Sequence, residues 1–145
     1  MNAPAIEACL KAFFEDDPRG AIAVYLFGSV ARGDAGPDSD VDVGVLFSVE
    51  PAPTLEAPQF SLEAEIERAL RRPVQVVALN RASADLVHRV LRDGKLILDR
   101  DPAARIRFEV QRRNEYFDLA PLRRLYRRFP APATPAAVPV GERRR

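Results

Sequence analysis

The pattern of hydrophobic and polar positions divides most of the chain into short strands and helices. Residues 21–27 are continuously apolar and combine β-branched with aromatic side chains, which predicts a strand covered on both faces. Residues 40–47 alternate instead: three valines and Phe47 share one face, whereas Asp40 and Asp42 share the other. We therefore expect the two carboxylates to point the same way, about 6.6 Å apart along the strand.

Further elements follow, separated by turns that contain proline or glycine. Strands are expected at residues 74–79 and 95–98. Helices are expected after a cap at Asn2, over residues 30–34, from a cap at Ser61 to Arg72, from a cap at Ser83 through Leu91, and from Asp101-Pro102 onward, with Pro121 kinking or interrupting the last one. Strands that alternate with helices predict an α/β protein, in which helices pack on a sheet.

Length and charge narrow the range of functions. A chain of 145 residues with 47% hydrophobic and 30% charged residues is expected to fold as one domain. The net charge of +1 gives no overall attraction to nucleic acid or membranes, so no direct nucleic-acid binding is expected. Residues 130–145 contain little large apolar surface, which predicts a folded domain over residues 1–129 and a disordered Pro/Ala/Arg tail over 130–145.

The C-terminal region is rich in arginine. Ile106, Val110 and Phe117 mark one face of the last helix, and arginines gather from Arg105 to Arg128. Such a cluster is commonly a solvated face. The alternative is a docking surface for an acidic partner.

Several single residues are expected to be structural. Cys9, the one cysteine of the sequence, cannot form an internal disulfide and suits a buried helix position. His88 has no second histidine with which to share a metal, and the tyrosines are expected to be packing residues. No secretory signal and no apolar run of bilayer length is evident, so a cytoplasmic location is expected.

The stretch between the first two strands contains the candidate chemistry. It reads G-S-V-A-R-G-D-A-G-P-D-S-D-V-D, from Gly28 to Asp42. Two aspartates on one strand face repel each other, and a cation between them removes that cost. A glycine-serine turn opening a short helix can hold phosphate oxygens with backbone N–H groups and a hydroxyl. Together these features predict a pocket for a metal-bound triphosphate.

Roles follow for the individual residues of this stretch. Asp40 and Asp42 are expected to hold Mg²⁺, as one ion or two, and to act as the catalytic carboxylates. Gly28 and Ser29 are expected to bind the nucleotide. Arg32 either contacts phosphate or forms a surface salt bridge, and Ser39 either binds a terminal phosphate or caps the loop.

The motif resembles a known signature. Gly28-Ser29, ten residues, and then Asp40-Val-Asp42 are similar to the signature of the polymerase β-like nucleotidyltransferases. The runs G-S-V-A-R-G and S-D-V-D-V-G-V look like its minimal nucleotidyltransferase branch. The resemblance also covers P-V-Q-V-V-A-L-N and R-V-L-R-D-G-K-L-I-L-D-R-D, and extends over roughly residues 5–128.

The resemblance implies a fold, a partner and a reaction. The fold is a small mixed β-sheet flanked by helices. Proteins of this branch occur as antitoxins paired with HEPN ribonuclease toxins, and some transfer AMP from ATP to a tyrosine of the toxin. An Mg²⁺- and ATP-dependent adenylyltransferase with a HEPN-type partner is therefore expected, and the small sheet and long last helix are also compatible with a homodimer.

The sequence departs from the family at one position. The family usually supplies a third carboxylate from the next core strand, where this chain has Gln75. An amide can offer a carbonyl oxygen but cannot take a proton at neutral pH. Two alternatives remain beside the leading one: a catalytically weak or inactive nucleotide-binding antitoxin that acts by occlusion, and a nucleotidyltransferase for an aminoglycoside-like small molecule.

Overall fold

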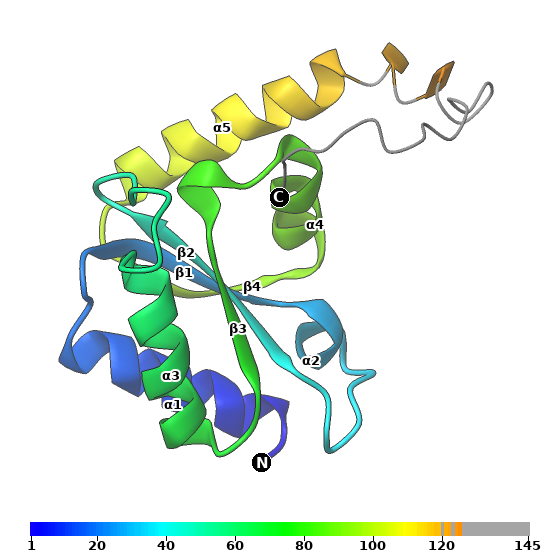
Figure 1. Ribbon diagram of the computed structural model, residues 1–145. Helices are drawn as coiled ribbons and strands as arrows, with labels where there is room; N and C mark the ends of the chain where they lie inside the picture. The colour runs from blue at the N-terminus through cyan, green and yellow to red at the C-terminus, as the bar shows by residue number, and fades with distance from the viewer. Residues whose placement is uncertain (120, 123, 126–145) are drawn as a thin grey trace, which may run out of the picture.

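The computed structural model describes residues 1–119, 121, 122, 124 and 125 and consists of one sheet with helices on both faces (Figure 1). The strands are β1 (Ala21–Phe27), β2 (Val41–Phe47), β3 (Val74–Ala78) and β4 (Lys95–Asp99). The helices are α1 (Ala3–Asp16), α2 (Gly28–Arg32), α3 (Pro58–Leu70), α4 (Ala84–Asp93) and α5 (Pro102–Asp118), and a 3₁₀ turn, η1 (Leu79–Arg81), lies between β3 and α4.

The sheet is mixed, as the resemblance of the sequence motif to the polymerase β-like nucleotidyltransferases implies. Its strand order is β3-β2-β1-β4. The first strand, β1, is antiparallel to both neighbours, whereas β2 and β3 run parallel. The register places Phe27 beside Asp42, and Asp42 beside Gln75. The end of β1 therefore lies next to the start of β2, and both lie close to the start of β3.

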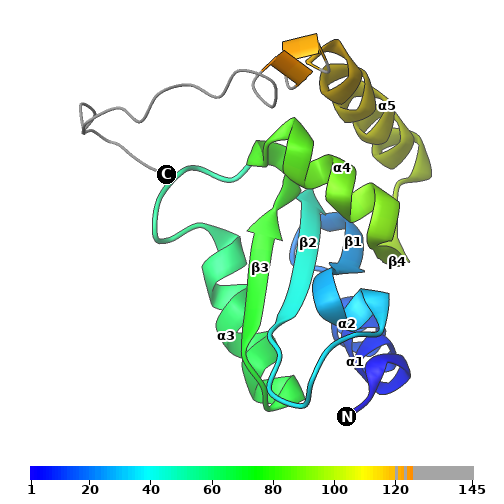
Figure 2. The ribbon, with the colours of Figure 1, turned by 90° about the vertical axis from the view of Figure 1, so that its right-hand side faces the viewer.

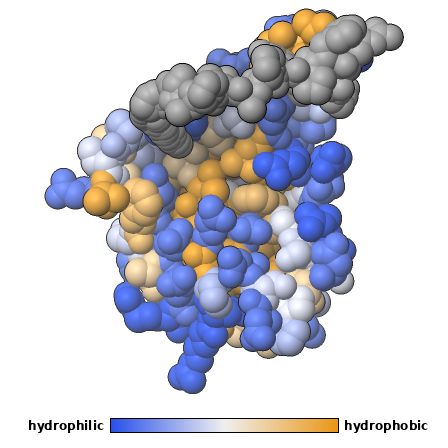
Figure 3. All heavy atoms as spheres, turned by 45° about the vertical axis from the view of Figure 1, so that its right-hand side comes forward, coloured by the Kyte–Doolittle hydropathy of each residue, from blue (hydrophilic) through white to orange (hydrophobic). Residues whose placement is uncertain are grey.

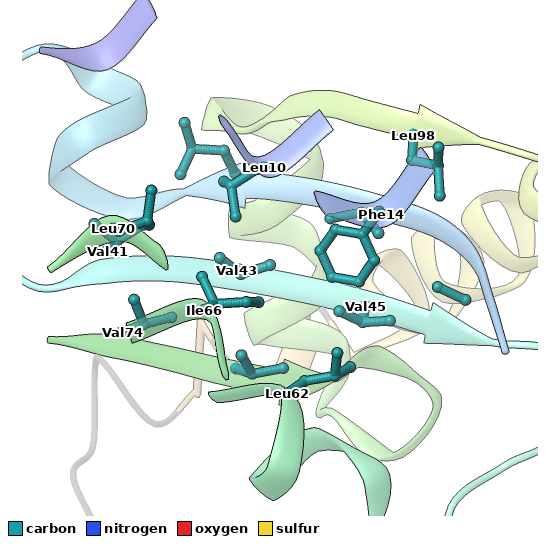
Figure 4. Close-up of a cluster of buried hydrophobic side chains, with 14 of the residues drawn as sticks. Leu10, Phe14, Val41, Val43, Val45, Leu62, Ile66, Leu70, Val74 and Leu98 are labelled. Atoms are coloured by element: carbon teal, nitrogen blue, oxygen red, sulfur yellow. The ribbon is translucent and has the colours of Figure 1, made fainter. Parts of the chain in front are cut away.

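The larger hydrophobic core fills the space between the sheet and the helices α1 and α3 (Figure 4). The alternating valines of β2 and Phe47 all face this side, as their spacing predicts. Phe14 of α1 and Ile66 of α3 meet them and are fully buried. Burying side chains of this size stabilises the fold by about 1.5–3 kcal/mol each.

A smaller core lies on the opposite face of the sheet. It combines Tyr25 and Leu46 of the sheet with Leu79 of η1 and with Val87 and Val90 of α4. Because β1 also contributes to the larger core, it is covered on both faces, which confirms the interpretation of its unbroken apolar run.

Three of the four expected helix caps are present. The side chains of Asn2, Ser83 and Asp101 accept hydrogen bonds from backbone N–H groups three residues later, at 3.0–3.2 Å. The prediction for Ser61 is wrong, because α3 begins at Pro58 and the Ser61 hydroxyl donates to the Pro58 carbonyl at 3.1 Å. Proline favours the first helical turn, where its missing N–H costs little, and this shifts the start towards the N-terminus.

The short helix after β1 begins earlier than the sequence predicts. Helical structure was expected over residues 30–34, but α2 starts at Gly28, directly at the end of β1. Gly28 has φ of +77°, a value that side chains other than glycine rarely tolerate, and this turns the chain without a connecting loop. Gly33, with φ of +84°, ends the helix.

The last helix, α5, has no buried residue. Ile106, Val110 and Phe117 share one face, as their spacing predicts, but that face points to solvent, and their exposed fractions are 49%, 46% and 58%. The helix ends at Asp118, Leu119 is a turn residue, and residues 121, 122, 124 and 125 are again helical, so the break comes before Pro121 and not at it. The expected disordered tail and Tyr126 lie outside the described residues.

Other expectations concern single residues and the membrane. Cys9 is half-buried and packs against the larger core. His88 stacks on the ring of Tyr116, with the ring centroids 3.7 Å apart. None of the helices in the described part of the chain is both long and apolar enough to cross a bilayer.

The burial of Phe14 leads to a stability prediction. Phe14→Ala leaves a void beneath α1, and we expect it to lower the free energy of unfolding by about 3–5 kcal/mol. Urea denaturation followed by circular dichroism measures this change. Lys11→Ala, on the exposed side of the same helix, is the matched control and should change it by less than about 0.5 kcal/mol. Equal effects of the two substitutions would contradict the assignment of the core.

Candidate functional site

A cavity of about 510 Å³ opens where β1 ends and β2 and β3 begin. The helices α2 and α4 lie beside these strands on the same side of the sheet (Figure 2). The cavity is lined by Phe27, Gly28, Ser29, Arg32, Asp42, Gln75, Val77, Leu86, Arg89, Arg92 and Asp93. Around this side of the molecule, hydrophobic side chains are bordered by hydrophilic ones (Figure 3). The cavity therefore combines apolar wall with charged groups of both signs.

Gly28 and Asp42 are in very close contact in this cavity. A Cβ atom on Gly28 would lie 2.1 Å from Oδ2 of Asp42 and 3.0 Å from its Cγ. The positive φ of Gly28 and the pairing of Phe27 with Asp42 produce this approach together. A side chain at position 28 would displace the carboxylate, so glycine is required here on two independent grounds.

Asp42 has an unfavourable electrostatic environment. Burial raises the pKa of its carboxyl group, the neighbouring charge of Asp40 raises it further, and Arg32 opposes both effects. The negative charge of Asp42 is thus only partly compensated by the protein. A cation next to the carboxylate would remove this penalty.

Asp40 and Ser39 stand at the margin of the site. Neither belongs to the cavity wall, and Asp40 is an exposed residue directly before β2, close enough to Asp42 to affect its pKa. The Ser39 hydroxyl accepts a hydrogen bond from the Gly36 N–H at 2.9 Å, and its carbonyl accepts one from Arg72 at 2.6 Å. These contacts correspond to the loop-capping alternative for Ser39.

Arg32 forms the surface salt bridge that was one of its two expected roles, and its position leaves the phosphate contact as a prediction. Its side chain lines the cavity, and its Nε also lies 3.4 Å from Oδ2 of Asp34. Because both side chains of this ion pair are largely exposed, the pair contributes little energy and leaves the guanidinium free to turn towards an anion.

Gln75 lies beside Asp42 on the adjacent strand. Its side chain is exposed and lines the cavity together with Val77, as their shared strand face predicts. Within the described residues, no three His, Cys, Asp or Glu side chains are close enough to bind one metal ion. Asp42, the nearby Asp40 and the Gln75 amide offer oxygen ligands, and such a partial set suits Mg²⁺, which keeps water and substrate oxygens in its coordination shell.

Three charged residues of α4 were missed by the sequence reasoning. Arg89, Arg92 and Asp93 all line the cavity together with Asp42 of β2. The Nε and Nη2 groups of Arg92 donate to the Asp93 carboxylate at 3.0 and 2.9 Å, and these hydrogen bonds lower the pKa of Asp93. The spacing of Arg89 and Arg92 placed them on one helical side, but nothing in the sequence indicated that this side faces Gly28.

Comparisons with known proteins agree with this geometry. A family model described as "Polymerase beta, Nucleotidyltransferase" matches residues 9–103. None of the curated proteins compared with the sequence matches it.

Solved structures of similar fold include toxin–antitoxin complexes. A chain of a toxin–antitoxin structure with AMP-PNP superimposes with a TM-score of 0.71 at 24% identity, covering 84% of this chain and 95% of that one. A complex of tri-AMPylated HEPN toxin with MNT antitoxin from Shewanella oneidensis gives 0.67 at 22% identity, covering 87% and 96%.

A third structure has higher sequence identity. It is assigned as a minimal nucleotidyltransferase and gives a TM-score of 0.54 at 32% identity, covering 66% of this chain and 95% of that one. This similarity agrees with the family match and with the close contact between the Gly28-Ser29 turn and Asp42. The chain belongs to the polymerase β-like nucleotidyltransferases.

Proposed function

We propose that the protein is the antitoxin of a HEPN toxin pair and transfers AMP from Mg-ATP to a tyrosine hydroxyl of the toxin. One observation carries the proposal: the glycine-serine turn, the aspartate of β2 and a group of arginines line the same cavity. Its volume of about 510 Å³ falls within the range of small-molecule sites.

The charges of the cavity suit a triphosphate with its metal ion. Ser29 and the backbone N–H groups of the turn would bind phosphate oxygens, as would Arg32. Arg89 and Arg92 approach from the opposite wall and would neutralise the pyrophosphate end. Asp40 and Asp42 would hold Mg²⁺, which supplies charge neutralisation at the reacting phosphate when it is bound.

The transfer exchanges one phosphorus–oxygen bond for another. The tyrosine oxygen of the acceptor bonds to the α-phosphorus, and the bond from that phosphorus to the bridging oxygen of the pyrophosphate breaks. The pyrophosphate leaves with its charge facing the arginines. The phenolic proton must pass to solvent or to a base outside this set, because the Gln75 amide does not accept it.

The solved complexes support a toxin partner. One related structure contains AMP-PNP, and another contains a toxin carrying AMP groups together with its MNT antitoxin. At 22–24% identity these complexes share the fold with this chain, and the extension of partner and reaction to this chain is our proposal.

A second function is favoured by one observation. Gln75 stands where the family usually has its third carboxylate, and removing a general base costs about 10²- to 10⁴-fold in rate. The chain would then neutralise its toxin by covering it, with nucleotide bound but turned over slowly or not at all.

A labelling experiment tests the proposed transfer. The protein is incubated with α-labelled ATP, Mg²⁺ and the HEPN protein encoded by the neighbouring reading frame, and label should appear on a toxin tyrosine. Asp42→Asn should lower the labelling at least about 100-fold, because it removes a metal-binding charge. Asp38→Asn, on the exposed loop before β2, is the matched control and should label as wild type. Absence of labelling by the wild-type chain would refute the transfer.

A substitution at position 75 distinguishes the two functions. Gln75→Asp restores a carboxylate beside Asp42, and we expect the labelling rate to rise by about tenfold or more. Thr54→Asp, an exposed position in the segment before α3, adds the same charge away from the cavity and should leave the rate unchanged. If Gln75→Asp has no effect while nucleotide still binds, occlusion is the better account.

The contact of Gly28 with Asp42 predicts a binding defect. Gly28→Ala should weaken the binding of Mg²⁺–AMP-PNP at least about tenfold in titration calorimetry, because the new methyl group displaces the carboxylate. Gly20→Ala is the matched control, since Gly20 has a similar φ of +82° but no atom within 4 Å of a built Cβ. Both substitutions strain a backbone of positive φ, at about 1 kcal/mol, and Gly28→Ala adds the cost of displacing Asp42. Equal nucleotide affinities of the two variants would contradict the assignment of the site.

A further inference from the structure

The solvent-facing side of α5 carries an apolar stripe. Ala103, Ile106, Val110 and Phe117 are all exposed and follow one another at separations of three, four and seven residues. Such spacing forms a narrow, straight seam along a helix, the pattern by which one helix packs against another. These four residues are called the α5 ridge below. Figure 1 shows α5 lying across the body of the protein next to α4, and among the described residues no helix or strand is drawn on its far side.

The inward side of α5 is attached to the body by polar and aromatic contacts. The Tyr25 hydroxyl donates to Glu109 at 2.6 Å, and Arg105 lies 3.0 Å from Asp99. Phe108 packs against the smaller core, and Arg112 donates to the carbonyls of Asn80 and Ala82. Ile106 and Val110 lie on the other side of the helix and stay exposed.

The margins of the α5 ridge are basic. At 3.6 residues per turn, Arg107 and Arg113 border it on opposite sides, and both are exposed. Glu109, between them in sequence, is half-buried and pairs with Arg105. Towards the C-terminal end of α5, Glu115 pairs with Arg112 but keeps a side chain that is 44% exposed, and Asp118 is exposed. The middle of the α5 ridge is therefore bordered by arginines, and exposed carboxylates occur only near its end.

We propose that the α5 ridge is the docking site for an amphipathic helix of the partner toxin, with an apolar seam flanked by acidic residues. The spacing of three, four and seven residues between the apolar side chains of the α5 ridge suits packing against another helix. Arg107 and Arg113 at its margins favour a partner helix with acidic residues on both sides of its apolar seam. This inference rests on the proposed function, because it takes the HEPN protein as the partner.

The same charges disfavour two other occupants. Two copies of the chain placed ridge to ridge would bring four guanidinium groups together along the middle of the two α5 helices. The C-terminal sequence ends in Arg143-Arg144-Arg145 and carries charge of the same sign as the margins. A partner with acidic residues would be attracted to Arg107 and Arg113, where these two occupants would be repelled.

Docking on α5 would place the partner next to the nucleotide cavity. The helix α5 packs against α4, where the His88 and Tyr116 rings stack nearly parallel at 3.7 Å. Arg89 and Arg92 of the same α4 helix line the cavity. A partner bound to the α5 ridge would therefore be held by a helix that packs directly on α4, and α4 forms one wall of the cavity.

Binding measurements with two kinds of variant test the docking site. In the full-length chain, Ile106→Ser combined with Val110→Ser should weaken binding of the HEPN protein encoded by the neighbouring reading frame at least about tenfold. Arg107→Glu combined with Arg113→Glu should weaken it similarly and reduce its sensitivity to salt. Gln111→Ser, an exposed α5 position beside the α5 ridge, is the matched control and should bind as wild type. Circular dichroism checks that each variant is folded.

The outcomes separate this inference from the proposed function. Unchanged toxin binding by the serine double variant, with labelling intact, overturns the docking site alone. Dimeric wild type with a monomeric serine variant would assign the α5 ridge to a second copy, and tighter toxin binding after removal of residues 126–145 would assign it to those residues; either result overturns the inference. Asp42→Asn should show the opposite pattern, in which the toxin is bound and not labelled. Toxin that is bound through the α5 ridge but never labelled by the wild-type chain would refute the transfer and leave the docking site standing.

Discussion

The close approach of Gly28 to Asp42 is the constraint on which the site depends. It requires β1 and β2 to pair in one register, with Phe27 beside Asp42, and it requires the chain to turn at a positive φ as soon as β1 ends. Shifting that register by one residue would move Asp42 to the opposite face of the sheet. The large core beneath β2 prevents this, because its valines have to remain buried. The packing of one sheet face thus determines the chemistry of the other.

The carboxylates at the cavity differ in how well they are compensated. Asp93 is paired with the neighbouring Arg92 of α4, whereas Asp42 of β2 has only the opposing charge of Arg32. Burial and the nearby Asp40 therefore raise the pKa of Asp42. The protein alone therefore holds an electrostatically unfavourable arrangement, which an added cation together with a polyanion would relieve. This imbalance is what distinguishes a prepared binding site from an ordinary surface salt bridge.

Local patterns predicted much of this structure because they depend on neighbours in sequence. The alternation of β2 assigned Asp42 to one face and the valines to the other, and the caps at Asn2, Ser83 and Asp101 follow from short-range hydrogen bonds. Periodicity also placed Ile106 and Phe117 on one side of α5. It could not say which side meets the body, because that depends on Tyr25 and Asp99, which are distant in sequence. Arg89 was missed for the same reason: its cavity forms only when α4 packs back on β1.

Gln75 occupies a position where a substitution can alter the site without disturbing the fold. It lies on β3, at the edge of the sheet, with an exposed side chain and a backbone that pairs with Asp42 whatever residue is present. Glutamine and glutamate have almost the same shape, so exchanging one for the other alters a single charge and leaves the core untouched. Under the proposed function, one replacement at position 75 would therefore change the acid–base chemistry of the site while the fold and the binding surfaces stay as they are.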